Sequence, residues 1–379
     1  MIKIGITGQA GFVGTHLYNL LGLCPEKYTR IPFQDAYFQD KNIFLEFVQK
    51  CDVIVHLAAM NRHNDPEVLY QTNIALVNQL IDACEKTNSK PHIVFSSSTQ
   101  EEKDNLYGKS KREGRELLGK WAERNGAHFT GLIIPNVYGP FGNPYYNSVV
   151  ATFCHQLTHN ETPKIDVDGV VKLIYVGELA NQITEIIDQV AQDKKNDTVV
   201  QTIKLQHTTE SAVSNILQLL ETFKTCYFEK GEMPALNTTF QRNLFNTFLC
   251  YIDHSTFFPF PLKLNTDQRG SFVETIKLNS GGQVSFSTTV PGITRGNHYH
   301  TRKAERFAVI KGKAKIEIRR IGTDKVFSFL LDGSKPSFVD MPVWFTHNIS
   351  NIGDEELYTI FWINEHFDNS NSDTFFEIV

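Results

Sequence analysis

The stretch IKIGITGQAGFVG, residues 2–14, decides the fold of the N-terminal part of the chain. It opens with a short apolar run that is typical of a buried strand. Gly8, Gly11 and Gly14 follow at once, and a helical pattern then continues to Leu23. Between a strand and a helix, such glycines permit a tight turn, close approach of a pyrophosphate and close helix packing. The glycine motif by itself is weak evidence for nucleotide binding. Its position between a strand and a helix is the context that such a site requires, so the stretch predicts a dinucleotide site.

Apolar strands and helical segments alternate over the first part of the chain. Further strands are expected at Asp52–Ala58 and His92–Ser96, and helices at Thr72–Cys84 and Tyr107–Asn125. Continuous apolar strands separated by helices indicate a parallel sheet that is covered on both faces. We therefore expect an α/β domain of the Rossmann type.

Length and composition bound the remaining possibilities. A chain of 379 residues is too long for one compact core and suggests two domains. The net charge of -5 gives no argument for a nucleic-acid or acidic-membrane partner. The 6 cysteines show no paired spacing, which indicates reduced thiols. Since there is also no signal peptide and no membrane-length apolar run, we expect a cytoplasmic protein.

The position that usually distinguishes NAD from NADP sites holds a basic residue. NAD sites carry an acidic residue at the end of the second strand, roughly 20 residues after the glycines. In KYTRIPF, residues 27–33, that place is taken by Arg30, with Asp35 further along. An arginine suits a 2′-phosphate, so NADPH is the predicted cofactor. If the strand is misregistered, Arg30 is instead an exposed loop residue.

A tyrosine and a lysine carry the predicted reductase chemistry. Tyr107 and Lys111 are four residues apart and share one helix face. The nearby ammonium is expected to favour the phenolate and lower the pKa of the tyrosine. Such a tyrosine exchanges a proton with a carbonyl or alcohol oxygen while a hydride moves. A hydroxyl from the serine run Ser96–Ser98 would hold that oxygen.

With DVIVHLAA (52–59) and PNVYGP (135–140), these residues resemble the extended short-chain dehydrogenase/reductases, a class of nucleotide-sugar epimerases, dehydratases and reductases. The resemblance covers residues 1 to about 245 and implies a catalytic triad of Ser98, Tyr107 and Lys111, with Thr99 as the neighbouring alternative to the serine. The segment between serine and tyrosine, QEEKDNL, is shorter than family members usually have. The residues expected at the cofactor are Gly8, Gly11, Phe12, Val13, Gly14, Arg30, Leu57, Ala58, Tyr107, Lys111 and Pro135.

The pattern changes near residue 250. The segment FFPFPLKLNTDQRG, residues 257–270, ends the helical pattern with two prolines and leads into short strands. Several of these alternate apolar and polar residues between turns, which indicates an antiparallel barrel or a double-sheet jelly roll. We expect a reductase domain with a small substrate lobe at 1–250 and an all-β domain at 251–379.

Four potential metal ligands occur in the second half. In GITRGNHYHTRKAERFAVIKG, residues 292–312, His298 and His300 are two apart, so a strand places both side chains on one face. Glu305 follows beyond a short turn, and His347 is the candidate from a distant strand. These residues suit zinc or another divalent first-row metal. The alternative is a pair of surface histidines on a polar turn.

This stretch also resembles the first cupin motif, whose spacing of two glycines, two histidines and a glutamate it matches throughout. The second motif is matched at Pro342, His347 and Asn351, although Trp344 stands where a glycine is usual. The cupin resemblance implies a metal-binding jelly roll.

Two phrases, DQRGSFVE (267–274) and TRGNHYH (294–300), resemble deoxysugar 3,5-epimerases of the dTDP-rhamnose type. That resemblance implies substrate contacts by Arg269, Glu274 and Arg295. In those epimerases the motif histidine is the base. If His298 is a metal ligand here, it cannot also be a free base, and the base is left unassigned.

Over essentially the whole chain, this combination resembles the CapF-type bifunctional enzymes of capsular polysaccharide synthesis, on the route to UDP-N-acetyl-L-fucosamine. The resemblance implies a UDP-linked 4-keto-6-deoxy-HexNAc substrate, NADPH, zinc and a homodimer. Chemistry supplies the order independently: epimerisation beside a ketone needs that ketone, and hydride transfer destroys it. The cupin must therefore act first, at carbon 3, and the reductase second, at carbon 4.

Three alternatives remain open at this point. The metal can merely stabilise the barrel, or the cupin can be a binding or dimerisation module beside a plain reductase. Phe257, Phe258 and Phe260 would suit such an interface, but a linker packed on the barrel explains them equally. In the third alternative, the reductase fold is retained only as a scaffold. The intact Tyr107–Lys111 pair argues against this alternative.

Overall fold

The computed structural model describes residues 1–192 and 198–379. The chain forms two compact units that interleave along the sequence, and each is described by itself. The first unit comprises Met1–Tyr138, Gly142–Val149 and Gly169–Ala212. The second comprises Gly139–Phe141, Val150–Asp168 and Val213–Val379.

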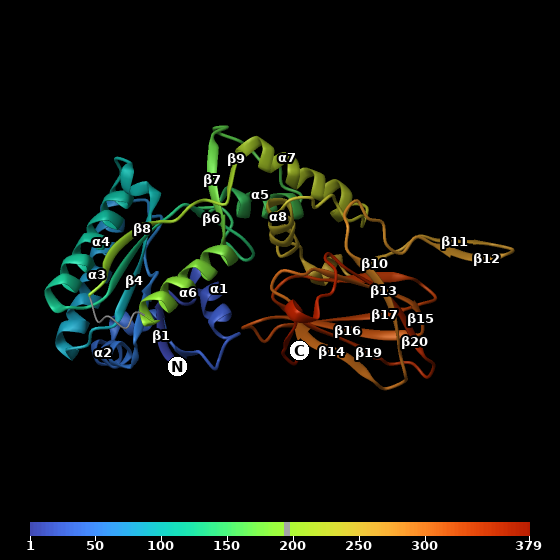
Figure 1. Cartoon of the computed structure of the whole chain (residues 1–379). Helices are drawn as coiled ribbons and strands as arrows, with labels where there is room; N and C mark the ends of the chain where they lie inside the picture. The colour runs from blue at the N-terminus through green and yellow to red at the C-terminus, as the bar shows by residue number, and fades with distance from the viewer. Residues whose placement is uncertain (193–197) are drawn as a thin grey trace. The chain divides into compact units, whose positions relative to one another are not determined.

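A six-stranded parallel sheet forms the centre of the first unit, and Figure 1 shows helices along it. The strand order is β2-β1-β3-β4-β5-β8, so the order reverses between β1 and β3, where doubly wound sheets bind their ligands. This confirms the expected Rossmann-type class. The strands are β1 Ile2–Thr7, β2 Tyr28–Ile31, β3 Val53–His56, β4 His92–Ser98, β5 Phe129–Ile134 and β8 Val200–Lys204.

Helices cover both faces of this sheet, as the uninterrupted apolar strands predict. One apolar cluster joins the sheet to α1 and α6, and a second joins it to α2, α3 and α4. A small sheet of β6 (Asn136–Tyr138), β7 (Val170–Tyr175) and β9 (Thr209–Ala212) completes the unit. The helices are α1 Phe12–Leu21, α2 Lys41–Lys50, α3 Pro66–Thr87, α4 Leu106–Asn125 and α6 Val176–Gln192.

Two antiparallel five-stranded sheets dominate the second unit, in the orders β10-β18-β15-β20-β13 and β17-β16-β19-β14-β21. They confirm the cupin-like double sheet expected from the alternating strand pattern. A separate hairpin of β11 and β12 precedes them (Figure 1). The strands are β10 Phe260–Pro261, β11 Leu264–Asp267, β12 Gly270–Val273, β13 Gln283–Thr289, β14 Thr294–Tyr299, β15 Glu305–Lys311, β16 Lys313–Arg320, β17 Val326–Asp332, β18 Ser337–Met341, β19 Phe345–Asn351, β20 Leu357–Ile363 and β21 Phe375–Phe376.

Helical segments of the second unit pack against these strands. Phe258 is buried in the β-domain core, and Phe257 and Phe260 pack against that core. These aromatic residues therefore serve as a linker packed on the barrel. The helices are α5 Val149–Thr158, of which residues 150–158 belong to this unit, α7 Val213–Phe223, the π-helix η3 Lys224–Phe228, α8 Thr239–Leu249 and α9 His254–Phe257. The domain division near residue 250 stays a prediction.

A buried ion pair ties η3 to the β-sheet. The Nε of Arg306 lies 2.8 Å from Oδ1 of Asp340, and both side chains are almost fully buried. The Tyr227 hydroxyl donates to Oδ2 of Asp340 at 2.6 Å, and Nη1 of Arg306 donates to the Gly231 carbonyl at 2.6 Å. Because a buried charge needs such partners, this network fixes how the helical segment covers the sheet.

Replacing Asp340 by alanine is expected to destabilise the second unit by about 3–5 kcal/mol, since it leaves the Arg306 charge buried without its partner. Urea denaturation followed by tryptophan fluorescence measures the effect. The matched control is Glu355→Ala, which breaks the exposed 3.4 Å pair with Lys311 and should leave the transition in place. Equal midpoints for the two variants would contradict the structural role of Asp340.

Among residues 1–192 and 198–379, no helix combines the length and apolar character needed to cross a membrane.

Candidate functional site

The glycine turn lies at the carboxyl end of β1, beside the residues that follow β3. Gly8 has a φ of +72°, and a Cβ there would come within 2.9 Å of the Ala58 nitrogen. A Cβ at Gly14 would lie 2.2 Å from the Gly8 carbonyl oxygen, so neither position accepts a larger residue. Gly11 is the N-cap of α1. The sheet's switch point thus presents a helix N-terminus of the kind that receives a pyrophosphate.

The other predicted cofactor residues lie along the same sheet edge, with one exception. Leu57 follows β3 and donates its N–H to the Thr7 carbonyl at 3.1 Å, and Pro135 follows β5. Phe12 and Val13 open α1. Their contacts with a cofactor stay predictions.

Arg30 is the exception. It lies on β2, but its Nη1 donates to the Tyr18 carbonyl at 3.1 Å, and its guanidinium stacks 4.3 Å from the centre of the Tyr18 ring. Tyr18 belongs to the later part of α1, whereas the glycine turn precedes that helix. In this structure the guanidinium of Arg30 is held by Tyr18, and its assignment as a phosphate ligand stays a prediction.

Tyr107 and Lys111 lie together on α4, next to the end of β4. Nζ of Lys111 donates to the Ser96 carbonyl at 3.0 Å and lies 5.8 Å from the centre of the Tyr107 ring. Burial lowers the pKa of Lys111 to about 8. Burial, together with Tyr146, raises the pKa of Tyr107 to about 12. The expectation of a lowered tyrosine pKa is therefore wrong for this structure, because desolvation of the phenolate raises the pKa of Tyr107.

The three serines at the end of β4 have different partners. Ser96 donates to the His56 carbonyl at 3.2 Å, and Ser97 donates to Glu101. Ser98 accepts from the Gln100 N–H at 3.2 Å and so caps the short 3-10 helix η2, residues Thr99–Glu102. Of the three, Ser98 stands at the carboxyl end of the strand, where the predicted catalytic hydroxyl belongs. Its catalytic role stays a prediction.

Sequence reasoning missed the hydrogen-bond partner of Tyr107, the predicted catalytic tyrosine. The Tyr107 hydroxyl donates to Oδ1 of Asn61 at 3.0 Å. Asn61 follows the recognised phrase at 52–59 by only two positions. The only available signal was therefore a polar residue placed shortly after the end of a parallel strand, where functional loops gather.

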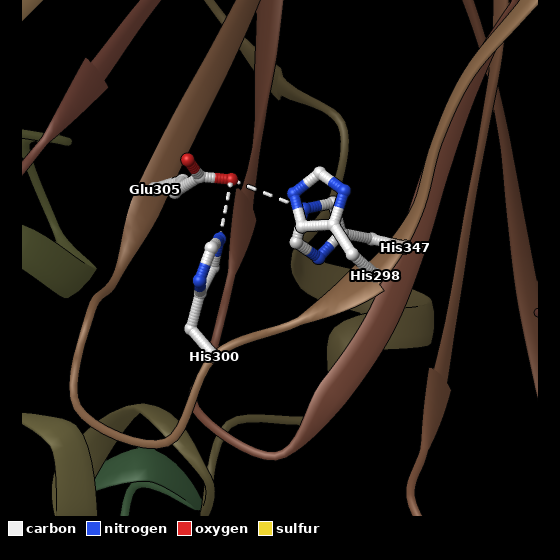
Figure 2. A group of neighbouring side chains, drawn as sticks. All are labelled: His298, His300, Glu305 and His347. Atoms are coloured by element: carbon white, nitrogen blue, oxygen red, sulfur yellow. Dashed lines mark ion pairs between the residues drawn. The ribbon is translucent and has the colours of Figure 1, made fainter. Parts of the chain in front are cut away.

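The four predicted metal ligands meet in the second unit, as Figure 2 shows. His298 lies on β14, directly opposite His347 on β19, and Glu305 opens β15. One ligand atom from each of the four residues lies within 4.8 Å of all the others. Oε2 of Glu305 is 3.3 Å from Nε2 of His300 and 3.0 Å from Nε2 of His347. Two ligands of a tetrahedral zinc ion lie about 3.3 Å apart, so these distances suit one metal.

Burial and charge also suit a cation at this cluster. Several buried polar atoms of the described residues lack a hydrogen-bond partner, and three of them meet at this cluster: Nε2 of His300, Nε2 of His347 and Oε2 of Glu305, which face only one another as ion pairs. Burial and His347 lower the pKa of His298 to about 4. Burial tends to raise the pKa of the Glu305 carboxyl, but the imidazoles of His300 and His347 outweigh burial and hold this pKa below its usual range. A neutral imidazole and an ionised carboxylate are the forms that bind metal.

Backbone groups orient the imidazoles. Nδ1 of His300 lies 2.5 Å from the Asp373 carbonyl, which leaves its Nε2 facing the cluster. Nδ1 of His347 lies 3.2 Å from the Phe345 carbonyl. Such outer contacts fix which nitrogen faces a metal. Asp373 is distant in sequence from every cupin motif residue, so no motif could have predicted its role.

The unusual tryptophan of the second cupin motif keeps a glycine-like backbone. Trp344 has a φ of +63°, the left-handed region that glycine favours. Its N–H donates to the His300 carbonyl at 2.7 Å, and its ring stacks on Tyr299 with ring centres 5.8 Å apart. These contacts offset the cost of the left-handed backbone, so the departure from the motif leaves the histidine strand in place.

The predicted substrate residues of the cupin have local partners. Arg269 pairs with Asp267 at 2.5 Å on the exposed hairpin, and Glu274 pairs with Lys277 at 3.0 Å. Arg295 donates to the Thr289 hydroxyl at 3.1 Å. The structure shows none of the three in contact with the four histidine and glutamate ligands, and their substrate contacts stay predictions.

The first unit therefore has the construction of the short-chain oxidoreductases that use a nicotinamide cofactor. Residues 4–200 match the NAD dependent epimerase/dehydratase family, and residues 265–375 match the Polysaccharide biosynthesis C-terminal domain. The UDP-2-acetamido-2,6-beta-L-arabino-hexul-4-ose reductase of Pseudomonas aeruginosa is 31% identical over 99% of this chain and 98% of that protein. UDP-glucuronate 4-epimerase 4 of Arabidopsis thaliana is 29% identical over 38% of this chain and 43% of that protein.

Two solved structures match from end to end. The capsular polysaccharide assembling protein CapF of Staphylococcus aureus superposes with a TM-score of 0.61 at 33% identity, covering 100% of both chains. A structure of CapF with the inhibitor 3-isopropenyl-tropolone gives 0.57 at 32% identity, again over 100% of both chains. The chain belongs to the NAD dependent epimerase/dehydratase family and, over its whole length, to its CapF-type members. It is an NAD(P)-dependent oxidoreductase.

Proposed function

We propose that the protein is a bifunctional nucleotide-sugar enzyme. The cupin domain epimerises carbon 3 of a UDP-2-acetamido-2,6-dideoxy-4-hexulose, and the reductase domain then reduces the 4-keto group with NADPH. The product is UDP-2-acetamido-2,6-dideoxy-L-talose, a precursor of UDP-N-acetyl-L-fucosamine for capsule or O-antigen. The single observation that carries the proposal is the presence of both sites in one chain: the Tyr107–Lys111 pair and the four converging metal ligands.

The reductase half rests on the geometry around α4. When bound, NADPH supplies the hydride to carbon 4. The neutral phenol of Tyr107 is the form that can give a proton to the ketone oxygen, and its raised pKa keeps it in that form at neutral pH. Lys111, held on the Ser96 carbonyl, then lies beside the phenolate that remains. The UDP-sugar reductase of Pseudomonas aeruginosa supports this substrate class.

The epimerase half rests on the metal ligands. His298, His300, Glu305 and His347 fit a divalent ion, with zinc favoured, because three of their buried polar atoms otherwise lack hydrogen-bond partners within the described residues. Such an ion would act as a Lewis acid for an enolate oxygen. If His298 is a metal ligand, it is not free to accept a proton, and another group must be the base that removes the proton from carbon 3.

The alternative is a monofunctional NADPH-dependent 4-keto-sugar reductase whose cupin is structural or dimerising. We also propose a homodimer in the cytoplasm that acts on the free nucleotide-sugar, with no nucleic-acid or membrane partner. The net charge of -5 supports the absence of a nucleic-acid partner.

An isotope experiment separates the two readings. The UDP-4-keto sugar is supplied in deuterated water, and label at carbon 3 is followed by mass spectrometry and NMR with and without NADPH. In the Tyr107→Phe variant we expect label to accumulate without reduction, because the ketone survives. The His300→Ala variant should lose the exchange. A wild-type protein that reduces the sugar without any exchange at carbon 3 would instead support the monofunctional reductase.

A further inference from the structure

The loop after β3 reaches the catalytic tyrosine through Asn61. Oδ1 of Asn61 accepts the hydrogen of the Tyr107 hydroxyl at 3.0 Å. The Asn61 backbone is also held on both sides: its N–H donates to the Tyr146 hydroxyl at 3.3 Å, and its carbonyl accepts from Nδ2 of Asn147 at 3.3 Å. The acceptor that meets the phenol is therefore fixed by three hydrogen bonds.

A buried amide anchors this loop to the catalytic helix itself. Asn73, on α3, accepts from the Met60 N–H at 2.7 Å and donates to the Met60 carbonyl at 3.0 Å. Its Nδ2 also donates to Oγ of Ser110 at 3.0 Å, and Ser110 donates to the Tyr107 carbonyl at 2.8 Å. The connections form a closed circuit from the Tyr107 hydroxyl back to the Tyr107 backbone. The distance between Asn61 and the phenol is thus set by rigid elements.

Arg62 fastens a second segment onto the same loop. Its Nη1 donates to the Tyr145 carbonyl at 2.8 Å and to the Tyr146 carbonyl at 3.2 Å. Residues 145–147 are thereby held beside Asn61.

We propose that Asn61 is the positioning residue for Tyr107 in the reduction, a proposal that rests on the reductase half of the proposed function. In the ligand-free protein its side-chain carbonyl takes the phenolic hydrogen and so holds the hydroxyl protonated and oriented. The substrate ketone oxygen then replaces Oδ1 as acceptor. As the hydride reaches carbon 4, the phenolic proton passes to the ketone oxygen, which leaves an alcohol and a phenolate, and solvent reprotonates the phenolate.

The first test needs no substrate. In protein labelled with 3-fluorotyrosine, the fluorine resonance that disappears in Tyr107→Phe belongs to Tyr107. Asn61→Ala should move this resonance and leave the other tyrosine resonances in place apart from that of Tyr146, and Asn61→Asp should restore it towards the wild-type position because it keeps the acceptor. The control is Asn64→Ala, an exposed residue of the same loop. An unmoved Tyr107 resonance in Asn61→Ala would overturn the proposal.

The second test is kinetic, with the UDP-4-keto sugar and NADPH. Asn61→Ala should lower kcat/KM about 10-fold to 100-fold, because the phenol is then no longer held in place in the free enzyme before the substrate binds. The alkaline limb of the pH profile of kcat/KM should move to lower pH, since the lost acceptor stabilised the protonated phenol. An unchanged kcat/KM with an unchanged pH profile would overturn the proposal. If wild type does not reduce this sugar, the proposed function fails, and the fluorine resonance alone decides the role of Asn61.

Discussion

Replacing Tyr107 by phenylalanine is expected to lower kcat for reduction of the 4-keto sugar by about 100-fold to 10,000-fold. The variant keeps the aromatic ring on α4 but has no proton for the ketone oxygen. Binding of NADPH should change far less than kcat, because the glycine turn and Lys111 are intact. Consumption of NADPH, followed by its absorbance, measures the rate, and fluorescence titration measures cofactor binding.

The control for Tyr107→Phe is Tyr70→Phe. The Tyr70 hydroxyl donates to Glu113, which also lies on α4, at 2.5 Å. Its loss removes a phenolic hydrogen bond from the same helix without touching the reaction centre, and the rate should stay near that of wild type. Full activity in Tyr107→Phe would show that another group supplies the proton, and it would remove the main support for the reductase assignment.

Replacing His347 by alanine is expected to weaken metal binding by at least about 100-fold, because even outer-shell changes at such sites cost 10-fold to 100-fold. His347 is fully buried, and its Nε2 meets Glu305 at 3.0 Å, so no neighbouring side chain can replace it. Elemental analysis after dialysis should find about one divalent ion per chain in wild type. It should find a small fraction of that in the variant.

The control for His347→Ala is His366→Ala, an exposed histidine of the same unit, which should retain the metal. A chelator should lower the thermal midpoint of wild type and of this control, because bound metal stabilises the folded state by mass action. The chelator should leave the thermal midpoint of the His347→Ala variant unchanged. Equal metal content in wild type and His347→Ala would contradict the four-ligand site, and a metal-free wild type with full exchange at carbon 3 would contradict metal-assisted epimerisation.

Features that depend on local spacing could be predicted from the sequence. The three glycines after an apolar strand indicated the turn that the structure shows, because a tight turn leaves no room for a Cβ at Gly8 or Gly14. The short spacing of His298 and His300 predicted that both would reach one site, and the structure brings them together although β14 ends at Tyr299, before His300. The alternating strands after residue 250 predicted the double sheet, since the period of side-chain burial follows directly from the pleat.

The direction and partners of long side chains could not be predicted in this way. Arg30 occupies the expected strand, but its guanidinium stacks on Tyr18, and only the packing of β2 against α1 decides that. The pKa of Tyr107 was predicted from a charge at fixed spacing. In the structure, partial burial of the ring among segments distant in sequence raises this pKa instead.

The sequence alone indicated the class of protein and the candidate metal ligands, because both follow from residue types at characteristic spacings. Only the tertiary structure decided which groups hold those residues in place. Asn61 lies 46 residues from Tyr107, and Asp373 lies 73 residues from His300. Contacts over such separations leave no periodic signal in the chain. They arise when strand ends and loops are brought to one place by burial of the apolar faces of the sheets.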